Sequence, residues 1–187
     1  AFTALEQAEP FVGRLLGVGL DSAERGNPAG RFTDVFARCR RLGLHAVAHA
    51  GEEGPAASIT EALDTLRAER IDHGVRCLED PTVVARLVRE RIPLTVCPLS
   101  NVSLRVCGSL SEHPLPRLLA AGLRASVHSD DPAYFGGYVN EALRRSLAAL
   151  PLSAADAYAL LRNSLESSFA PEAEKARDLD RLDEVFS

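Results

Sequence analysis

The stretch that decides the fold is Val127-His128-Ser129-Asp130-Asp131-Pro132-Ala133-Tyr134-Phe135-Gly136-Gly137-Tyr138. The apolar segment 123–128 leads into it and is predicted to be a buried strand, which Pro132 ends. A solvated turn also accommodates Asp-Asp-Pro. At the carboxyl end of a parallel strand, however, adjacent aspartates can direct one carboxylate to a metal and leave the other for a ligand. The stretch is therefore a candidate for part of an active site.

Five short strands are predicted, and helical segments separate them. The strands end near Leu20, His49, His73, Pro98 and Asp130. This alternation with short connections predicts a parallel sheet. An open doubly wound sheet would need a glycine-rich phosphate turn, and neither G-x-G-x-x-G nor G-K-[ST] occurs. Polar side chains follow every strand, which favours an α/β fold of the TIM-type (β/α)8 barrel, with residues 1–187 carrying about the last five β/α units.

Several helix starts carry sequence signals. Ser58, with Glu61 three residues later, predicts a capping box for a helix that runs to residue 67. Asp80 and Pro81 predict the cap and the first position of a helix that runs to residue 89. The tail is predicted to form three helices, over 139–150, 153–167 and 173–186.

Composition and charge limit the class of protein. The sequence is 46% hydrophobic and 25% charged, as is ordinary for one globular domain. The net charge of -5 argues against a nucleic-acid groove, and no apolar run approaches the roughly 20 residues that cross a bilayer. No C-x-x-C pair occurs, so we expect four reduced thiols and a cytoplasmic location. These are Cys39, Cys77, Cys97 and Cys107.

The start of the sequence is unusual. The chain begins at Ala1, in the middle of a helix-like segment, and contains no methionine. We therefore expect residues 1–187 to be the C-terminal portion of a single barrel domain in a longer protein.

Four residues at the strand ends suggest metal-assisted acid–base chemistry. His49 and Asp130 are candidate zinc ligands, because Zn²⁺ accepts neutral imidazole and carboxylate oxygen. A histidine at a strand end is, on its own, more often a hydrogen-bonded structural residue. Glu52, three residues after His49, favours the metal hypothesis because a carboxyl group there can act as a general acid. His73 is a further ionisable group that could orient or deprotonate a water molecule.

Four ordered motifs resemble those of the adenosine and adenine deaminases, in the metal-dependent amidohydrolase superfamily. They cover nearly the whole chain and are His49-Ala50-Gly51-Glu52, Ile71-Asp72-His73-Gly74, Cys97-Pro98-Leu99-Ser100-Asn101 and Ser129-Asp130-Asp131-Pro132.

The resemblance implies a role for each matching residue. His49 and Asp130 would bind one Zn²⁺ per chain in the complete protein, and Glu52 would donate a proton to the purine N1. His73 would help to activate the zinc-bound water, and Asp131 would accept a hydrogen bond from the N7 side of the purine. The His-x-His that supplies the family's other ligands does not occur in this sequence. The zinc design of the cytidine deaminases, with H-x-E and P-C-x-x-C, does not occur either.

The substrate within the family is predicted from the loop Asp21-Ser22-Ala23-Glu24. In adenosine deaminases the corresponding segment resembles Asp-x-Ala-Gly, and the glycine leaves room beside the base. Glu24 would crowd a ribose there and could hydrogen-bond a free base, although it could also be a surface loop acid. The stretch from Asp131 to Tyr138 also resembles the adenine deaminase branch.

The sequence therefore predicts an enzyme with a small-molecule purine substrate and no nucleic-acid or membrane partner. The predicted reaction is the zinc-dependent hydrolytic deamination of a 6-aminopurine, adenine to hypoxanthine and ammonia. One alternative is deamination of adenosine or of another adenine-bearing metabolite. An alternative from another class is a metal-free, non-catalytic relative that binds purines. The oligomeric state does not follow from the sequence.

Overall fold

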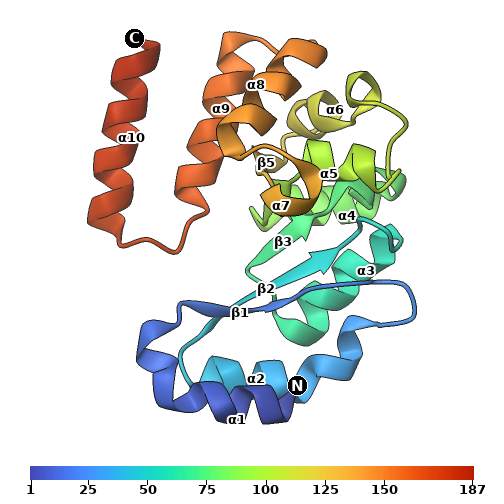
Figure 1. Cartoon of the computed structure of the whole chain (residues 1–187), viewed down its shortest axis with the longest axis vertical. Helices are drawn as coiled ribbons and strands as arrows, with labels where there is room; N and C mark the ends of the chain where they lie inside the picture. The colour runs from blue at the N-terminus through green and yellow to red at the C-terminus, as the bar shows by residue number, and fades with distance from the viewer. The chain divides into compact units, whose positions relative to one another are not determined.

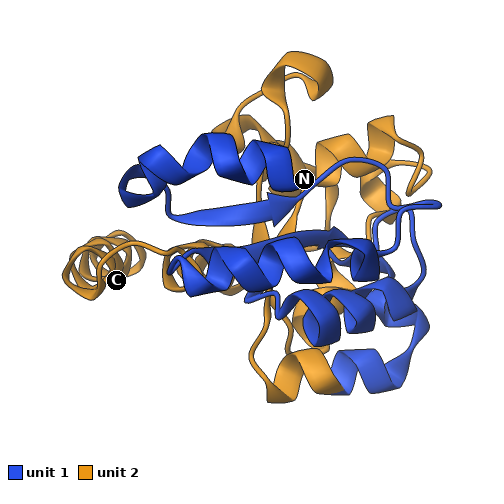
Figure 2. Cartoon of the chain, turned by 90° about the horizontal axis from the view of Figure 1, so that it is seen from below, with its two compact units in different colours: residues 1–85 blue, residues 86–187 orange.

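The protein is described by a computed structural model that covers residues 1–187 (Figure 1). Its internal contacts divide the chain into two compact units, Ala1–Ala85 and Arg86–Ser187 (Figure 2). The boundary between them falls inside helix α4 (Pro81–Arg89). The assignment of residues 1–187 to one barrel domain stays a prediction.

The first unit is built on three parallel strands, β1 (Gly17–Leu20), β2 (His45–Ala50) and β3 (Arg70–His73). Strand β2 lies between the other two, with Leu20 beside Ala48 and Ala50 beside His73. The α-helices of this unit are α1 (Phe2–Ala8), α2 (Thr33–Arg41) and α3 (Ala56–Glu61). Its other helical segments are η1 (Glu9–Arg14), η2 (Ala29–Phe32), the π-helical η3 (Ala62–Leu66) and η4 (Val75–Glu79).

The alternation of side chains along β2 positions the candidate site. Ala46, Ala48 and Ala50 are completely buried, while the residues between them are half-buried. Because successive side chains of a strand point to opposite faces, the alanines share one face and His49 lies on the other. The small alanines let the neighbouring helices approach their face of β2 closely. The opposite face of the strand carries His49.

The second unit contains the parallel pair β4 (Pro93–Val96) and β5 (Arg124–Val127), in which Val96 lies beside Val127. Helix α9 (Ala154–Glu166) packs against β5, and the Asn163 side-chain amide donates a hydrogen bond of 2.9 Å to the Ala125 carbonyl. The remaining elements are α5 (Pro98–Ser103), η5 (Leu110–Glu112), α6 (Leu115–Ala120), α7 (Pro132–Phe135), α8 (Val139–Ala149) and α10 (Glu172–Phe186).

The five predicted strands and the three predicted tail helices are confirmed. The Asp80 cap is confirmed as well, since its Oδ1 accepts a 2.8 Å hydrogen bond from the Thr82 backbone N–H. The hydrogen bonds from the Thr82 hydroxyl and from its backbone N–H lower the pKa of Asp80 below its usual value. Local signals were therefore sufficient at these positions.

Two expectations about where elements begin and end were wrong. Helix α3 begins at Ala56, with Pro55 in an extended conformation before it, so Ser58 lies inside the helix. Glu61 does not complete a capping box, because its carboxylate accepts a 3.0 Å hydrogen bond from the Gly30 backbone N–H. The fourth strand was predicted to end near Pro98, whereas β4 ends at Val96 and Pro98 already belongs to the short helix α5. Pro98 stands at the first position of that helix, where its missing N–H costs nothing.

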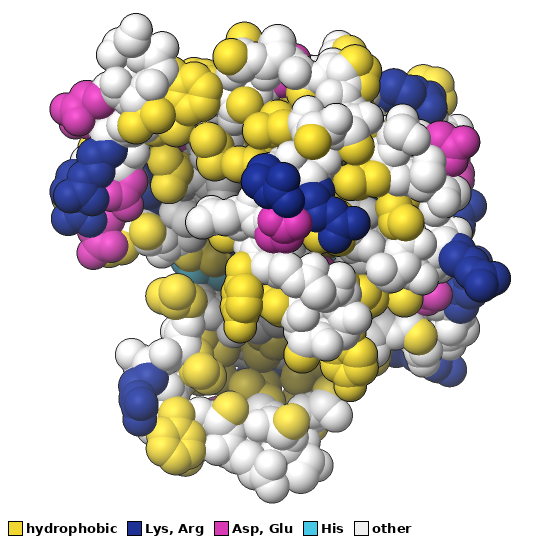
Figure 3. Space-filling model, turned by 45° about the horizontal axis from the view of Figure 1, so that its top comes forward, with side chains coloured by type: hydrophobic (Ala, Val, Ile, Leu, Met, Phe, Trp, Pro, Cys, Tyr) yellow, Lys and Arg dark blue, Asp and Glu magenta, His cyan; other side chains and the backbone are white.

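The surface carries charges of both signs. On the face drawn in Figure 3, basic and acidic side chains lie next to one another. None of the helices is long and apolar enough to span a membrane.

Candidate active site

Three of the predicted site residues lie together where β2 and β3 end. His49 is the residue before the last in β2, Glu52 lies in the loop that follows, and His73 is the last residue of β3. Glu52 Oε1 lies 3.1 Å from His73 Nδ1, and the ring centroids of His49 and His73 are 4.7 Å apart. Glu52 and His73 are 7% and 1% exposed. The structure thus gathers a buried carboxyl group and two imidazoles at one point.

The backbone of His73 makes this arrangement possible. In the sheet, His49 lies beside Asp72, so these two side chains share a face and His73 would be expected on the other. His73 has a φ of 65°, in the left-handed region that is uncommon for residues other than glycine. This ends the regular alternation, and both Asp72 and His73 lie next to His49. Uncommon backbone conformations of this kind occur frequently at functional sites.

The surroundings of His49 fit a metal ligand. Its Nδ1 is buried, lies 3.6 Å from Asp72 Oδ2, and makes no hydrogen bond of ordinary geometry. Its Nε2 lies 3.4 Å from Asp21 Oδ1. Histidines that bind metals commonly direct their second ring nitrogen at a carboxylate, which fixes the ring and the tautomer. Asp72 is placed to do this, so Nε2 is the nitrogen with which His49 could hold zinc.

Neither Asp21 nor Asp72 was predicted to belong to the site. Asp72 stands inside the third-strand motif, but its neighbour across the sheet depends on the strand register, which no local signal encodes. Asp21 follows the last residue of β1, and its position at a strand end was the only available signal. A cavity of about 250 Å³ opens beside His49, and Asp21, Glu24, Phe32 and Ser58 are among its lining residues.

Glu24 lies differently from what was expected. Its Oε1 accepts backbone hydrogen bonds from Glu52, at 2.8 Å, and Glu53, at 3.1 Å. Its Oε2 accepts from Gly51, at 2.8 Å, and Gly54, at 3.2 Å. Sequence reasoning directed this carboxylate at the substrate, whereas here both oxygens bind the turn that carries Glu52.

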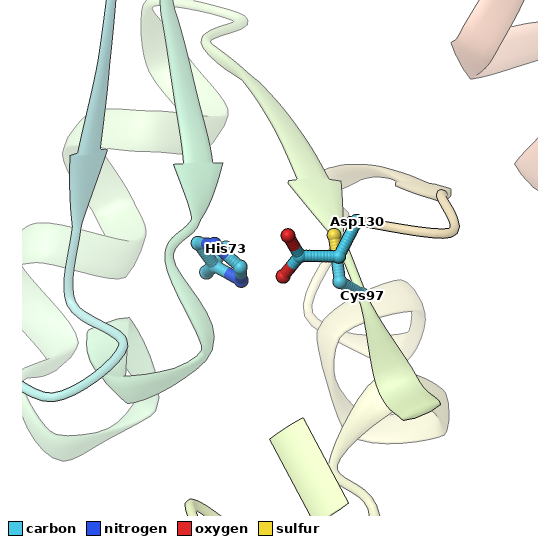
Figure 4. Close-up of side chains that lie close together, drawn as sticks. All are labelled: His73, Cys97 and Asp130. Carbon is cyan, nitrogen blue, oxygen red and sulfur yellow. The ribbon is translucent and has the colours of Figure 1, made fainter. Parts of the chain in front are cut away.

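In the second unit, Asp130 and Asp131 follow β5. Asp130 has a φ of 58°, again in the left-handed region, and its Oδ1 accepts a 2.9 Å hydrogen bond from the Asp131 N–H. Asp131 caps α7, since its Oδ1 accepts a 2.9 Å hydrogen bond from the Ala133 N–H. Figure 4 draws Asp130 together with His73 and Cys97, each from the end of a different strand.

His113 has the environment of a structural residue. It is 3% exposed, and its Nε2 lies 3.1 Å from Asn101 Oδ1. Its Nδ1 accepts a 3.1 Å hydrogen bond from the Leu115 backbone N–H. Burial lowers the pKa of His113 to about 4, so the ring is neutral at physiological pH. Such a residue holds the helix start and is not available as an acid or base.

The family follows from comparison with known proteins. A family model described as adenosine deaminase matches residues 6–185. The chain belongs to the adenosine deaminase family. Adenine deaminases of Cupriavidus necator and Geotalea uraniireducens are 59% and 62% identical to it, over 100% of this chain and 53% of their own length. The chain thus spans about half the length of these curated relatives.

Solved structures of similar proteins have the same fold. The crystal structure of adenine deaminase from Arthrobacter aurescens is 53% identical, with a TM-score of 0.94 over 97% of this chain and 56% of its own. An amidohydrolase from Burkholderia ambifaria, solved with bound Zn, is 25% identical, with a TM-score of 0.80 over 91% of this chain and 50% of its own. The predicted fold class is confirmed: the chain carries five β/α units of the deaminase barrel.

Proposed function

We propose that this chain is the catalytic C-terminal half of a zinc-dependent adenine deaminase, which hydrolyses adenine to hypoxanthine and ammonia. The observation that carries the proposal is the buried pair of Glu52 and His73 beside His49, at the ends of β2 and β3. The adenine deaminases that are about 60% identical over the whole chain support the choice of reaction.

Glu52 is proposed to supply the proton for the purine ring. Hydrolytic attack at C6 breaks the aromatic amidine, and a proton delivered to N1 neutralises the charge that would otherwise build up there. The amino group then takes up a proton and leaves C6 as ammonia, while the C6 hydroxyl loses its proton and its oxygen remains in hypoxanthine. A carboxyl group that is 7% exposed suits this task, because exclusion of water keeps its proton for the substrate.

His73 is proposed to act on the attacking water. Its Nδ1 lies against Glu52, so Nε2 is the nitrogen that would orient the water and accept its proton. This division assigns the two protons of the reaction to two neighbouring groups. Asp131 is proposed to accept a hydrogen bond from the N7 side of the purine with the oxygen that does not cap α7.

Zinc is proposed to bind His49 and Asp130, together with ligands that these 187 residues do not contain. The donor set of imidazole and carboxylate is one that zinc accepts, and the carboxylate beside the second nitrogen of His49 fits a ligating histidine. When bound, zinc would lower the pKa of water towards 7 and so make hydroxide available at neutral pH.

Two other functions remain open to test. Adenosine, or another adenine-bearing metabolite, could be the preferred substrate of the same site. A metal-free, purine-binding relative is the alternative from another class, and the clustering of Glu52, His73 and His49 argues against it.

We further propose a cytoplasmic location, which the four free cysteines support.

One set of measurements separates these functions. The complete protein is assayed for metal content and for kcat/KM with adenine and with adenosine. We expect about one zinc per chain and a preference for adenine. Turnover of adenosine in preference to adenine would support the second substrate, and binding of adenine without metal or turnover would support the non-catalytic relative.

A further inference from the structure

The turn that carries Glu52 is held by an acid from another loop. The backbone N–H groups of residues 51–54 all point at the carboxylate of Glu24, with N–O distances from 2.8 to 3.2 Å. An ionised carboxylate offers about four lone-pair sites, so this one carboxylate is engaged by four donors. Hydrogen bonds to a charged acceptor are roughly twice as strong as those between neutral groups.

The same turn is fixed from its carbonyl side. The Arg76 backbone N–H donates a 2.9 Å hydrogen bond to the Gly51 carbonyl, and its guanidinium donates one of 2.7 Å to the Glu53 carbonyl. Donors and acceptors of the turn therefore both have partners that come from outside it. The conformation of the loop around Glu52 is set by the two side chains of Glu24 and Arg76.

Two glycines leave the room that this arrangement needs. Gly51 has a φ of 70°, and a Cβ atom at this position would overlap the Ile59 side chain. A Cβ atom at Gly54 would overlap the Glu24 carboxylate and the Ser58 hydroxyl. The carboxylate and the turn thus fit each other closely, and a larger residue at Gly54 would separate them.

We infer that Glu24 is a positioning residue for the general acid Glu52, and not a contact of the substrate. This inference rests on the proposed function for the role of Glu52. Because all four N–H groups converge on Glu24, the backbone of Glu52 is held where its side chain lies against His73. Loss of this carboxylate would let the turn move and would misplace the acid, while the metal ligands and the purine contacts stay in place.

The test compares Glu24→Gln with wild type in the complete, zinc-loaded enzyme. The amide of glutamine has one acceptor oxygen, so at least two of the four N–H groups lose their partner. We expect kcat to fall about 10- to 100-fold, with KM within about threefold and zinc retained, because misplacement of a reacting group by about 1 Å can cost 10²-fold. The matched control is Glu69→Gln, since Glu69 also accepts a backbone hydrogen bond, from Ala46, and lies at the other end of β2. This control should keep the wild-type kcat.

A double-variant cycle decides whether Glu24 acts through Glu52. Residues that work as one unit have non-additive effects, so adding Glu24→Gln to Glu52→Gln should change kcat less than about twofold. If the two effects multiply, Glu24 acts independently of Glu52 and the inference is overturned. A rise in the KM for adenine, or a changed ratio of kcat/KM between adenine and adenosine, would instead identify Glu24 as a substrate contact.

A readout without catalysis keeps this inference separate from the proposed function. Hydrogen exchange of the peptide that contains residues 51–54 should be at least about tenfold faster in Glu24→Gln than in wild type, and unchanged in Glu69→Gln. If Glu24→Gln does not fold, Glu24→Asp retains the charge with a shorter reach, and it should give the same changes at smaller size. Unchanged exchange in the folded variant overturns the inference, even if the enzyme deaminates adenine. If hydrogen exchange is faster in Glu24→Gln but the wild-type protein has no deaminase activity, the proposed function is refuted while the holding of the turn by Glu24 stands.

Discussion

At the scale of single residues, the site depends on side chains whose surroundings differ sharply. Glu52 and His73 are buried against each other, whereas the His49 side chain is partly exposed and has a carboxylate beside Nδ1. Each of these surroundings predicts a different consequence of substitution.

Glu52→Gln should separate catalysis from binding. Glutamine keeps the size and the polar character of the side chain but has no acidic proton, so kcat should fall by at least about 10²-fold, the usual scale for general acid–base catalysis. Zinc content and the KM for adenine should stay near wild type. Steady-state kinetics with metal analysis would show this, and a change confined to KM would mean that Glu52 only binds substrate.

His49→Ala should remove most of the zinc from the complete protein. The imidazole is proposed to be a ligand, and a catalytic zinc site has only about three protein ligands, so the loss of one weakens binding strongly. The matched control is His45→Ala, which removes a half-exposed histidine four residues earlier on the same strand. Metal content measured by atomic spectrometry should be near wild type in the control. Retention of zinc and activity by His49→Ala would exclude this residue as a ligand.

His113 should make the protein less stable as the pH falls from about 6.5 to about 4. Its pKa is lowered from 6.5 to about 4 by burial, so in this range the unfolded state binds more protons than the folded state. One pKa unit corresponds to about 1.4 kcal/mol, so the free energy of unfolding should lose up to about 3 kcal/mol. Chemical denaturation at a series of pH values gives the free energy of unfolding of wild type and of His113→Gln. Below pH 6.5 this free energy should fall more steeply with decreasing pH in wild type than in the variant. Parallel pH profiles would contradict the assignment.

At the scale of elements, three helices begin at a side-chain cap, which is Asp80 for α4, Asp131 for α7 and Ser153 for α9. Ser153 and Asp156 form a capping box at the start of α9, with the Asp156 N–H donating a 3.1 Å hydrogen bond to Ser153 Oγ and the Ser153 N–H donating one of 2.8 Å to Asp156 Oδ2. Helix α9 packs on β5, the strand that precedes Asp130.

Ser153→Ala should therefore destabilise the second unit. Loss of a serine cap costs about 1 kcal/mol, because an N–H of the first turn is left without its acceptor. Ser153→Thr keeps the hydroxyl and serves as the control, with a smaller change expected. Chemical denaturation of the two variants would measure the difference, and equal stability of Ser153→Ala and wild type would mean that the box contributes nothing.

At the scale of the whole molecule, β1 is the edge strand of the sheet and its surroundings are apolar. Phe11, Leu15 and Leu16 are 55%, 42% and 68% exposed in this region. A groove of about 420 Å³ also runs along β1 and is lined by Leu5, Val18 and Phe36, among others. An open strand edge with apolar neighbours is a template for pairing with another chain.

Residues 1–187 produced by themselves should consequently self-associate. Light scattering after size exclusion should detect species larger than a monomer, in amounts that grow with protein concentration. Leu16→Lys places a charge beside this edge at little cost to the core, and it should reduce the association. A monodisperse monomer of the unaltered chain would show that the edge is adequately protected.

The sequence by itself determined the order of strands and helices, and which of their ends carry chemistry. The shared direction of parallel strands places His49, Glu52 and His73 at the same end of the sheet, because each follows or ends a strand. The Asp80 cap followed from local reasoning as well, since its partner Thr82 lies two residues away.

Only the tertiary structure decided the partners of these groups. Glu24 is 27 to 30 residues from the N–H groups that it accepts, and Asp72 meets His49 through a strand register that neither segment encodes alone. Helix α5 and the left-handed backbone of His73 were likewise beyond local signals. The sequence does not show whether a carboxylate in a loop faces substrate, water or backbone amides. These cases differ only in where the hydrogen-bond donors lie in space.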